Sequence, residues 1–277
     1  MRTFDIETLF PLLREAAQSH ILPHFLVLEQ NGISQKANAD DLVTLADVNT
    51  ENALTQLLRE RYPQALVVGE ESVYREPALL DRVANAELAF IIDPIDGTWN
   101  FAHGLPIFGV MIGVTHYGET IAGVIYYPIS QDFIFAVRGQ GAFRFHQHTG
   151  RQQKLKVASA VPCQAMRGFI LLSQFPPEQR PKLASSLPAF SHVSTFRCSA
   201  YEYRLMVQGS VHFVLNAHLN AWDHAAGQLI HTEAGGYSAL IDGRPYSPLL
   251  REGQLLLAPD FTSWLETRAI LLGDSSN

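Results

Sequence analysis

The stretch FIIDPIDGTWNF, residues 90–101, decides the fold and points to the functional site. Its apolar start predicts a buried strand that delivers Asp93 to its exposed end. Pro94 has no amide hydrogen and ends the pairing, so Asp96 returns beside Asp93, and Gly97 permits a tight turn. Two neighbouring carboxylates on a rigid turn can share divalent cations, and Mg²⁺ prefers such oxygen ligands.

The residues after this turn support a site more than a surface loop. If Thr98 begins a helix, the amides of Gly97 and Thr98 point outward and can hold a phosphate oxygen. The alternative is an ordinary surface turn, because Asp-Pro and Asp-Gly pairs are common there. A surface turn does not need Trp99 and Phe101 beside it, so we favour the buried site.

Three other segments place acidic residues at the ends of predicted elements. Glu70 follows a short apolar strand in GEES, Asp223 starts a predicted helix in AWDHAAG, and Asp47 ends DLVTLAD, downstream of Lys36. Each has a plain alternative: a solvated pair of charges, a helix N-cap, or a favourable charge in a first helical turn. None of the three segments is specific alone.

Composition narrows the class of protein. The 277 residues carry a net charge of −7, with 47% hydrophobic and 17% charged residues, which is typical of a globular chain. The acidic balance argues against a nucleic-acid partner. No apolar run is long enough to span a membrane, and the start lacks a signal-peptide pattern. With Cys163 and Cys198 interpreted as free structural thiols, we expect a cytoplasmic protein.

The hydrophobic pattern predicts an α/β fold whose two halves differ. The first half begins with helices and continues as an antiparallel meander over 110–116, 120–127 and 133–137. The second half alternates strands with helices, which predicts a mostly parallel sheet. A polar segment at 147–153 is the expected seam, so we expect a single domain of two lobes, 1–147 and 148–277, sharing one core.

Taken together, these segments resemble the inositol monophosphatase family, which belongs with fructose-1,6-bisphosphatase to the lithium-sensitive, Mg²⁺-dependent phosphatases. The resemblance runs from about Phe4 to Ala258 and rests on DPIDGT followed by Asn-Phe, on the distal WDHAAG, and on EAGG at 233–236. It implies a layered αβαβα sandwich of the sugar-phosphatase type. It also implies two or three Mg²⁺ ions per site, a homodimer and sensitivity to lithium.

The resemblance also implies roles for individual residues. One metal ion would be held by Glu70, Asp93 and the backbone carbonyl of Ile95, and a second by Asp93, Asp96 and Asp223. A weaker third ion would use Glu70 and water, with Lys36 nearby. Asp47, Thr98 and Glu70 would orient or activate the attacking water. The substrate would contact these residues: Lys36, Asp96, Gly97, Thr98, Ser199, Asn216 and Asp223.

The implied activity is hydrolysis of a small phosphate monoester by metal-activated water, with myo-inositol monophosphate or a related polyol phosphate as the first expectation. Trp99, Asn216, His231 and the stretch 197–199 depart from the family pattern without touching a proposed metal ligand. They leave the substrate open: histidinol phosphate, a nucleotide 3′-phosphate or a sugar bisphosphate are alternatives. A regulatory protein that keeps the fold is the alternative from another class.

Overall fold

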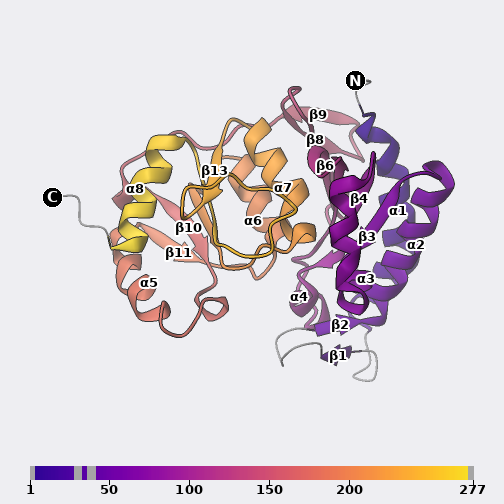
Figure 1. Ribbon diagram of the computed structural model, residues 1–277, viewed down its shortest axis with the longest axis horizontal. Coiled ribbons are helices and arrows are strands. Elements are labelled where there is room, and N and C mark those ends of the chain that lie inside the picture. The colour runs from indigo at the N-terminus through magenta and orange to yellow at the C-terminus, as the bar shows by residue number, and fades with distance from the viewer. Residues whose placement is uncertain (1–3, 28–32, 36–41, 274–277) are drawn as a thin grey trace.

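The computed structural model describes residues 4–27, 33–35 and 42–273, which form five layers of helices and sheets (Figure 1). Two helices cover the outer face of a seven-stranded sheet, two more fill the space between this sheet and a second one, and two cover the far face of the second sheet. The predicted αβαβα sandwich is confirmed.

The first sheet has the order β3-β4-β5-β6-β7-β8-β9. Only β3 and β4 pair in parallel, and every other neighbour is antiparallel, as the meander pattern predicted. Its last strand, β9, lies beyond the predicted lobe boundary after residue 147. The strands are Leu66–Gly69, Ala89–Asp96, Gly109–His116, Glu119–Tyr127, Asp132–Val137, Ala142–His146 and Arg151–Lys154. A separate antiparallel ribbon joins β1, Ile33–Gln35, to β2, Leu42–Thr44.

The second sheet has the order β11-β10-β12-β14-β13. Four of its strands run in the same direction and β14 alone is reversed, so the expectation of a mostly parallel sheet is confirmed. In that order the strands are His192–Ser194, Arg167–Ile170, Phe213–Asn216, Leu255–Ala258 and Tyr237–Leu240.

The helices fall into three layers. The outer layer of the first sheet holds α1, Phe10–Ala16, and α2, Leu45–Arg61. The middle layer holds α6, Ser199–Val207, and α7, Ala221–Glu233, and the far layer holds α5, Arg180–Ser186, and α8, Phe261–Leu272. Two short helices, α3 (Glu70–Arg75) and α4 (Thr98–Ala102), follow strands of the first sheet. Short 3₁₀ or π turns cover 6–9, 17–21, 77–85, 163–165, 172–174 and 187–189.

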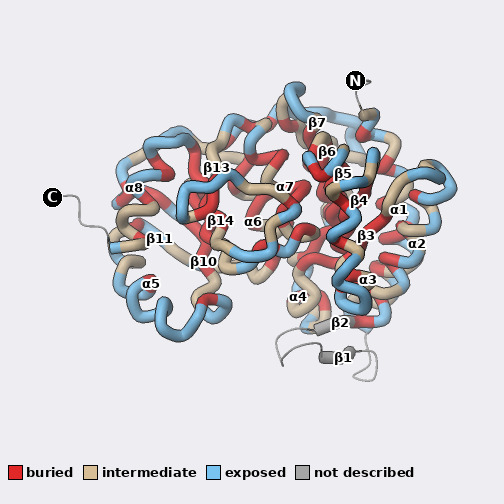
Figure 2. Tube along the Cα trace, in the orientation of Figure 1, coloured by how far each residue is buried: buried red, intermediate tan, exposed pale blue. Residues whose placement is uncertain are grey.

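The alternation of side chains along the strands builds a separate core on each face. Phe90 and Ile112 pack under α1 and α2, whereas Met111 and Ile125 face the middle layer together with Val214 of the second sheet. The middle core therefore contains side chains from both sheets. Figure 2 shows buried residues along the strands of both sheets and along α6 and α7. Among the described helices, none combines the length and apolarity needed to cross a bilayer.

Glycines let α7 lie directly on the first sheet. A Cβ atom at Gly113 would lie 2.7 Å from the Cβ of Ala225, and one at Gly123 would lie 2.7 Å from the Cα of Ala226. Real Cβ atoms do not approach other atoms so closely, so only glycine fits at either position with α7 in its observed place. This close packing positions the first turn of α7, and with it Asp223.

Candidate active site

Three carboxylates converge where the end of β4 meets the start of α7. Asp93 and Asp96 come from β4 and Asp223 from the first turn of α7, and one oxygen of each lies within 4.8 Å of the others. β4 does not end at Pro94 as predicted. It continues to Asp96, and its register against β5 shifts between Asp93 and Asp96. This irregularity, of the kind a β-bulge produces, lets two acidic residues of one strand approach the same point.

Burial makes this acidic cluster electrostatically costly without a cation. Asp93 is 2% exposed, and burial raises its pKa well above the usual range, with Glu70, Asp96 and Asp223 adding repulsion. Burial also raises the pKa of Asp96, although the Ala200 amide and the Cys198 thiol donate to its carboxylate. Among the described residues, Asp93 Oδ1 has no hydrogen-bond partner. A buried, unpartnered oxygen among acidic groups fits a hard metal ion, so the cluster could hold one.

Glu70 lines the same cavity from the first turn of α3. Its segment is fixed by Glu51 of α2, whose carboxylate accepts from the amides of Glu71 at 2.7 Å and Ser72 at 2.8 Å. A Cβ atom at Gly69 would overlap the Glu51 side chain, so this position needs glycine. Sequence reasoning missed Glu51, because an acidic residue in the middle of a predicted helix gives no signal of such a role.

Thr98 connects the cluster to Asp47. The Thr98 hydroxyl lies 3.2 Å from Asp47 Oδ1 and 2.9 Å from the carbonyl oxygen of Ile95. The other oxygen of Asp47 accepts from the amide and the hydroxyl of Thr44, which caps α2. The same carboxylate therefore takes part in the cap of α2 and contacts Thr98. Gly97, at φ +90°, makes the turn into α4.

The cavity around the cluster has a volume of about 740 Å³ and gathers most of the predicted site residues. Asp47 contacts it through Thr98, whereas Lys36 lies outside the described residues. The predicted residues that line the cavity are Glu70, Asp93, Ile95, Asp96, Gly97, Thr98, Ser199, Asn216 and Asp223. Arg197, Cys198 and Glu202 also line it, although the sequence predicted no site role for any of them.

Glu202 lines the cavity between β11 and α6. Its Oε1 accepts from the Thr195 hydroxyl and the Phe196 amide, each at 3.0 Å. Burial raises the pKa of Glu202 from about 4.5 to about 7. The helical spacing of buried residues along α6 places position 202 on the buried face, but it does not predict the partners of Glu202.

Glu202→Gln is expected to stabilise the protein above pH 7. Between about pH 4.5 and 7 the unfolded chain has released a proton that folded Glu202 retains, so rising pH favours unfolding. The slope approaches about 1.4 kcal/mol per pH unit. Glutamine keeps the oxygen that accepts both hydrogen bonds and does not titrate. Urea unfolding at pH 5 and pH 8 should show the advantage of the variant growing with pH, and a constant difference would contradict this.

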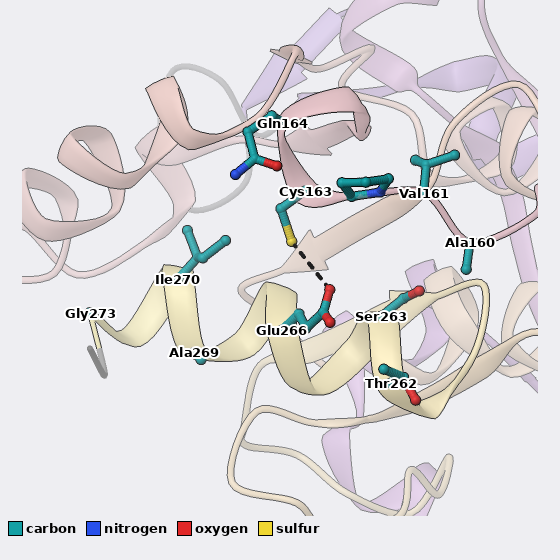
Figure 3. A pocket seen from close by; sticks show the side chains of 11 residues that line it. Ala160, Val161, Cys163, Gln164, Thr262, Ser263, Glu266, Ala269, Ile270 and Gly273 are labelled. Carbon is teal, nitrogen blue, oxygen red and sulfur yellow. Dashed lines mark hydrogen bonds between the residues drawn. The ribbon is translucent and has the colours of Figure 1, made fainter. Parts of the chain in front are cut away.

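A second hollow, of about 810 Å³, lies on the outer face between α8 and residues 160–164 (Figure 3). Cys163 Sγ lies 3.8 Å from Glu266 Oε2 across it. It is the larger of the two, but Glu266 is the only carboxylate among its lining residues. The acidic lining, and not the volume, therefore distinguishes the first cavity as the candidate active site.

The comparisons with known proteins agree with this geometry. The model of the inositol monophosphatase family matches residues 4–271. The chain belongs to this family. Its inositol monophosphatase relatives include a protein named Inositol-1-monophosphatase from Caulobacter vibrioides, 31% identical over 80% of this chain and 84% of the relative. They also include one named Nus factor SuhB from Haemophilus influenzae, 33% identical over 82% of this chain and 81% of the relative.

Solved structures of the inositol monophosphatase family share the fold. An IMPase of Thermotoga maritima superposes with a TM-score of 0.78 at 21% identity, covering 97% of this chain and 96% of the other. The suhB protein of Bartonella henselae gives the same score at 23% identity, covering 96% and 97%. At these identities the likeness concerns the fold alone.

Proposed function

We propose that the protein is a Mg²⁺-dependent phosphatase that hydrolyses a small phosphate monoester, with a polyol phosphate as the first candidate substrate. The observation that carries the proposal is the buried carboxylate cluster, in which Asp93 keeps an oxygen without a partner among the described residues. Family membership supports the reaction class. Lithium sensitivity and a homodimer are proposals that rest on the family resemblance alone, and a cytoplasmic location is a proposal that rests on the interpretation of Cys163 and Cys198 as free thiols.

In this proposal Glu70, Asp93 and the Ile95 carbonyl hold one ion, and Asp93, Asp96 and Asp223 hold the second. Such ions, when bound, neutralise phosphate charge and lower the pKa of an attacking water. The Thr98 hydroxyl, held by Asp47 and the Ile95 carbonyl, orients that water. The amides at Gly97 and Thr98 bind a phosphate oxygen. Positioning and electrostatics supply most of the rate in such reactions, so no protein nucleophile is required.

The test is a turnover screen over phosphate monoesters with Mg²⁺, followed by chelation. We expect release of inorganic phosphate from at least one polyol or sugar phosphate, loss of activity in excess chelator, and recovery when Mg²⁺ is restored. Every proposed ligand atom is an oxygen, which favours Mg²⁺ over zinc. Full activity after exhaustive chelation would contradict the proposal.

A regulatory role is the second candidate, because several relatives carry the name Nus factor SuhB. A regulatory protein could keep the fold and bind a macromolecule without turnover. The described residues retain Glu70, Asp93, Asp96 and Asp223 in one cavity, which favours catalysis. A chain that binds Mg²⁺ and a phosphate monoester but releases no phosphate would favour the regulatory role.

Asn216→Glu is expected to raise the preference for myo-inositol 1-phosphate over glycerol 2-phosphate about tenfold. Asn216 ends β12 and lines the cavity, and a carboxylate there accepts a substrate hydroxyl more strongly than an amide does. A hydrogen bond to a charged group contributes about 1.5–3 kcal/mol, which is tenfold or more. The measurement is kcat/KM for both substrates, with the change in KM. An unchanged ratio would mean that residue 216 does not face the leaving group.

A further inference from the structure

One wall of the acidic cavity carries an arginine stacked on a tryptophan. The Arg197 guanidinium carbon lies 4.3 Å from the ring centroid of Trp99, and both residues line the cavity. Trp99 is itself held from its own helix. Its ring stacks on His103 at 4.0 Å, and His103 Nδ1 lies 2.7 Å from the Trp99 carbonyl oxygen. The arginine therefore rests on a fixed aromatic surface next to Gly97 and Thr98.

Two buried side chains, Glu202 and Asn100, hold the backbone that leads into Arg197. Glu202 accepts from Thr195 and Phe196, and the Asn100 side-chain amide donates to the Phe196 carbonyl at 2.8 Å. Arg197 then adopts φ +53°, a left-handed conformation that residues other than glycine rarely adopt. Its amide donates to the Thr195 hydroxyl at 3.0 Å. Buried partners that hold a side chain in a rare backbone conformation point to a functional role for that side chain.

The charges of the residues that line the cavity indicate what the Arg197 guanidinium could bind. Among the described lining residues, Arg197 is the only arginine or lysine, beside the carboxyl groups of Glu70, Asp93, Asp96, Glu202 and Asp223. A guanidinium has five N–H donors in a planar fork that matches a carboxylate or a phosphate. The cavity, at about 740 Å³, has room for a substrate larger than a phosphate group.

We propose that Arg197, supported by Trp99, binds a second anionic group of the substrate. The preferred substrates then carry a carboxylate or another phosphate besides the phosphate that is hydrolysed. This inference rests on the proposed phosphatase function and names its substrate class. Arg197 acts as a specificity residue, because it contacts the part of the substrate that leaves.

The test compares matched substrates with and without the second charge. Glycerol 2-phosphate and glycerate 2-phosphate differ by one carboxylate, and fructose 1-phosphate and fructose 1,6-bisphosphate differ by one phosphate. We expect the native protein to favour the more anionic member of each pair by about tenfold or more in kcat/KM. Arg197→Gln should bring each ratio close to one, and Arg197→Lys should retain part of it. Arg244→Gln, which removes an exposed charge outside the cavity, should leave the ratios unchanged.

Two results would overturn the inference while leaving the phosphatase function intact. One is a native protein that turns over both members of each pair equally. The other is Arg197→Gln lowering kcat/KM equally for both members, which would place Arg197 on the hydrolysed phosphate or in a structural role.

If no phosphate is released from any substrate, the proposed function fails. Calorimetric binding of the same pairs then decides the inference: equal affinities in the native protein overturn it, and a preference that Arg197→Gln abolishes supports it.

Discussion

Asp93→Asn is expected to lower kcat/KM by more than about a hundredfold, because substitutions that only support a metal ligand already cost about 10–100-fold. Asp93 is the carboxylate proposed to contact both ions, and its Oδ1 has no partner among the described residues. Losing its charge would weaken both ion sites together. The measurement is phosphate release at saturating Mg²⁺, with folding checked by circular dichroism. Near-normal turnover in a folded variant would contradict the proposal that Asp93 bridges both ions.

The same substitution is expected to raise the melting temperature in chelator at pH 7. Burial and neighbouring acids raise the pKa of Asp93 in the folded protein. Above the ordinary pKa of an aspartate, ionisation therefore favours the unfolded chain, and stability falls as pH rises. Asparagine removes that effect. Asp81→Asn is the matched control, because Asp81 is 76% exposed in a surface ion pair and should change stability little. A lower melting temperature for Asp93→Asn in chelator would contradict the electrostatic account.

Gly123→Val is expected to reduce the free energy of unfolding by about 3 kcal/mol or more, at the upper end of overpacking effects. A Cβ atom at Gly123 would lie 2.7 Å from the Cα and 2.8 Å from the carbonyl oxygen of Ala226. These are backbone atoms of α7, so no rotamer change can relieve the overlap. The helix must move off the sheet, and Asp223 moves with it. Activity should therefore fall in the fraction that stays folded.

Urea unfolding and kcat measure the two effects separately. Gln152→Val adds the same β-branched side chain to the exposed strand β9 and should change stability by about 0.5 kcal/mol or less. A Gly123→Val protein as stable as the native chain would mean that α7 does not approach the sheet as closely as described. Native stability with full activity would contradict the role of this packing in positioning Asp223.

The sequence predicted the acidic residues of the candidate site better than it predicted the residues that hold them in place. An apolar strand that ends in acidic residues is a local pattern, so Asp93 could be proposed from it, whereas Glu70 was proposed only through the family resemblance. Glu51 could not be proposed, because its partners lie 20 and 21 residues along the chain and only the folded backbone brings them together. Arg197 was noted only as part of a departure from the family pattern. Its stacking on Trp99 depends on a left-handed backbone that no local rule predicts.

For the fold too, the sequence predicted much of what local patterns determine and missed what depends on long-range pairing. Alternating apolar residues predicted the hairpins of the first sheet, since period two is a local property. Helix α8 was missed, although Asp260 caps its start and Gly273 ends it in a left-handed conformation. Strand β9 was also missed: all four of its residues are exposed, so it carries no hydrophobic alternation. The expected seam at 147–153 overlaps this strand, because polar residues indicate a loop when cross-strand pairing is not visible.

The carboxylate cluster draws its members from segments made at different times during translation. Asp93 and Asp96 belong to β4, whereas Asp223 lies in α7, 130 positions beyond Asp93. At cellular synthesis rates the ribosome adds that stretch in roughly ten seconds. A nascent chain in that interval already carries two of the acids but lacks the third and the helix that buries them. A cation that needs the complete trio would therefore bind late in biogenesis, and its binding would report that the middle layer has docked.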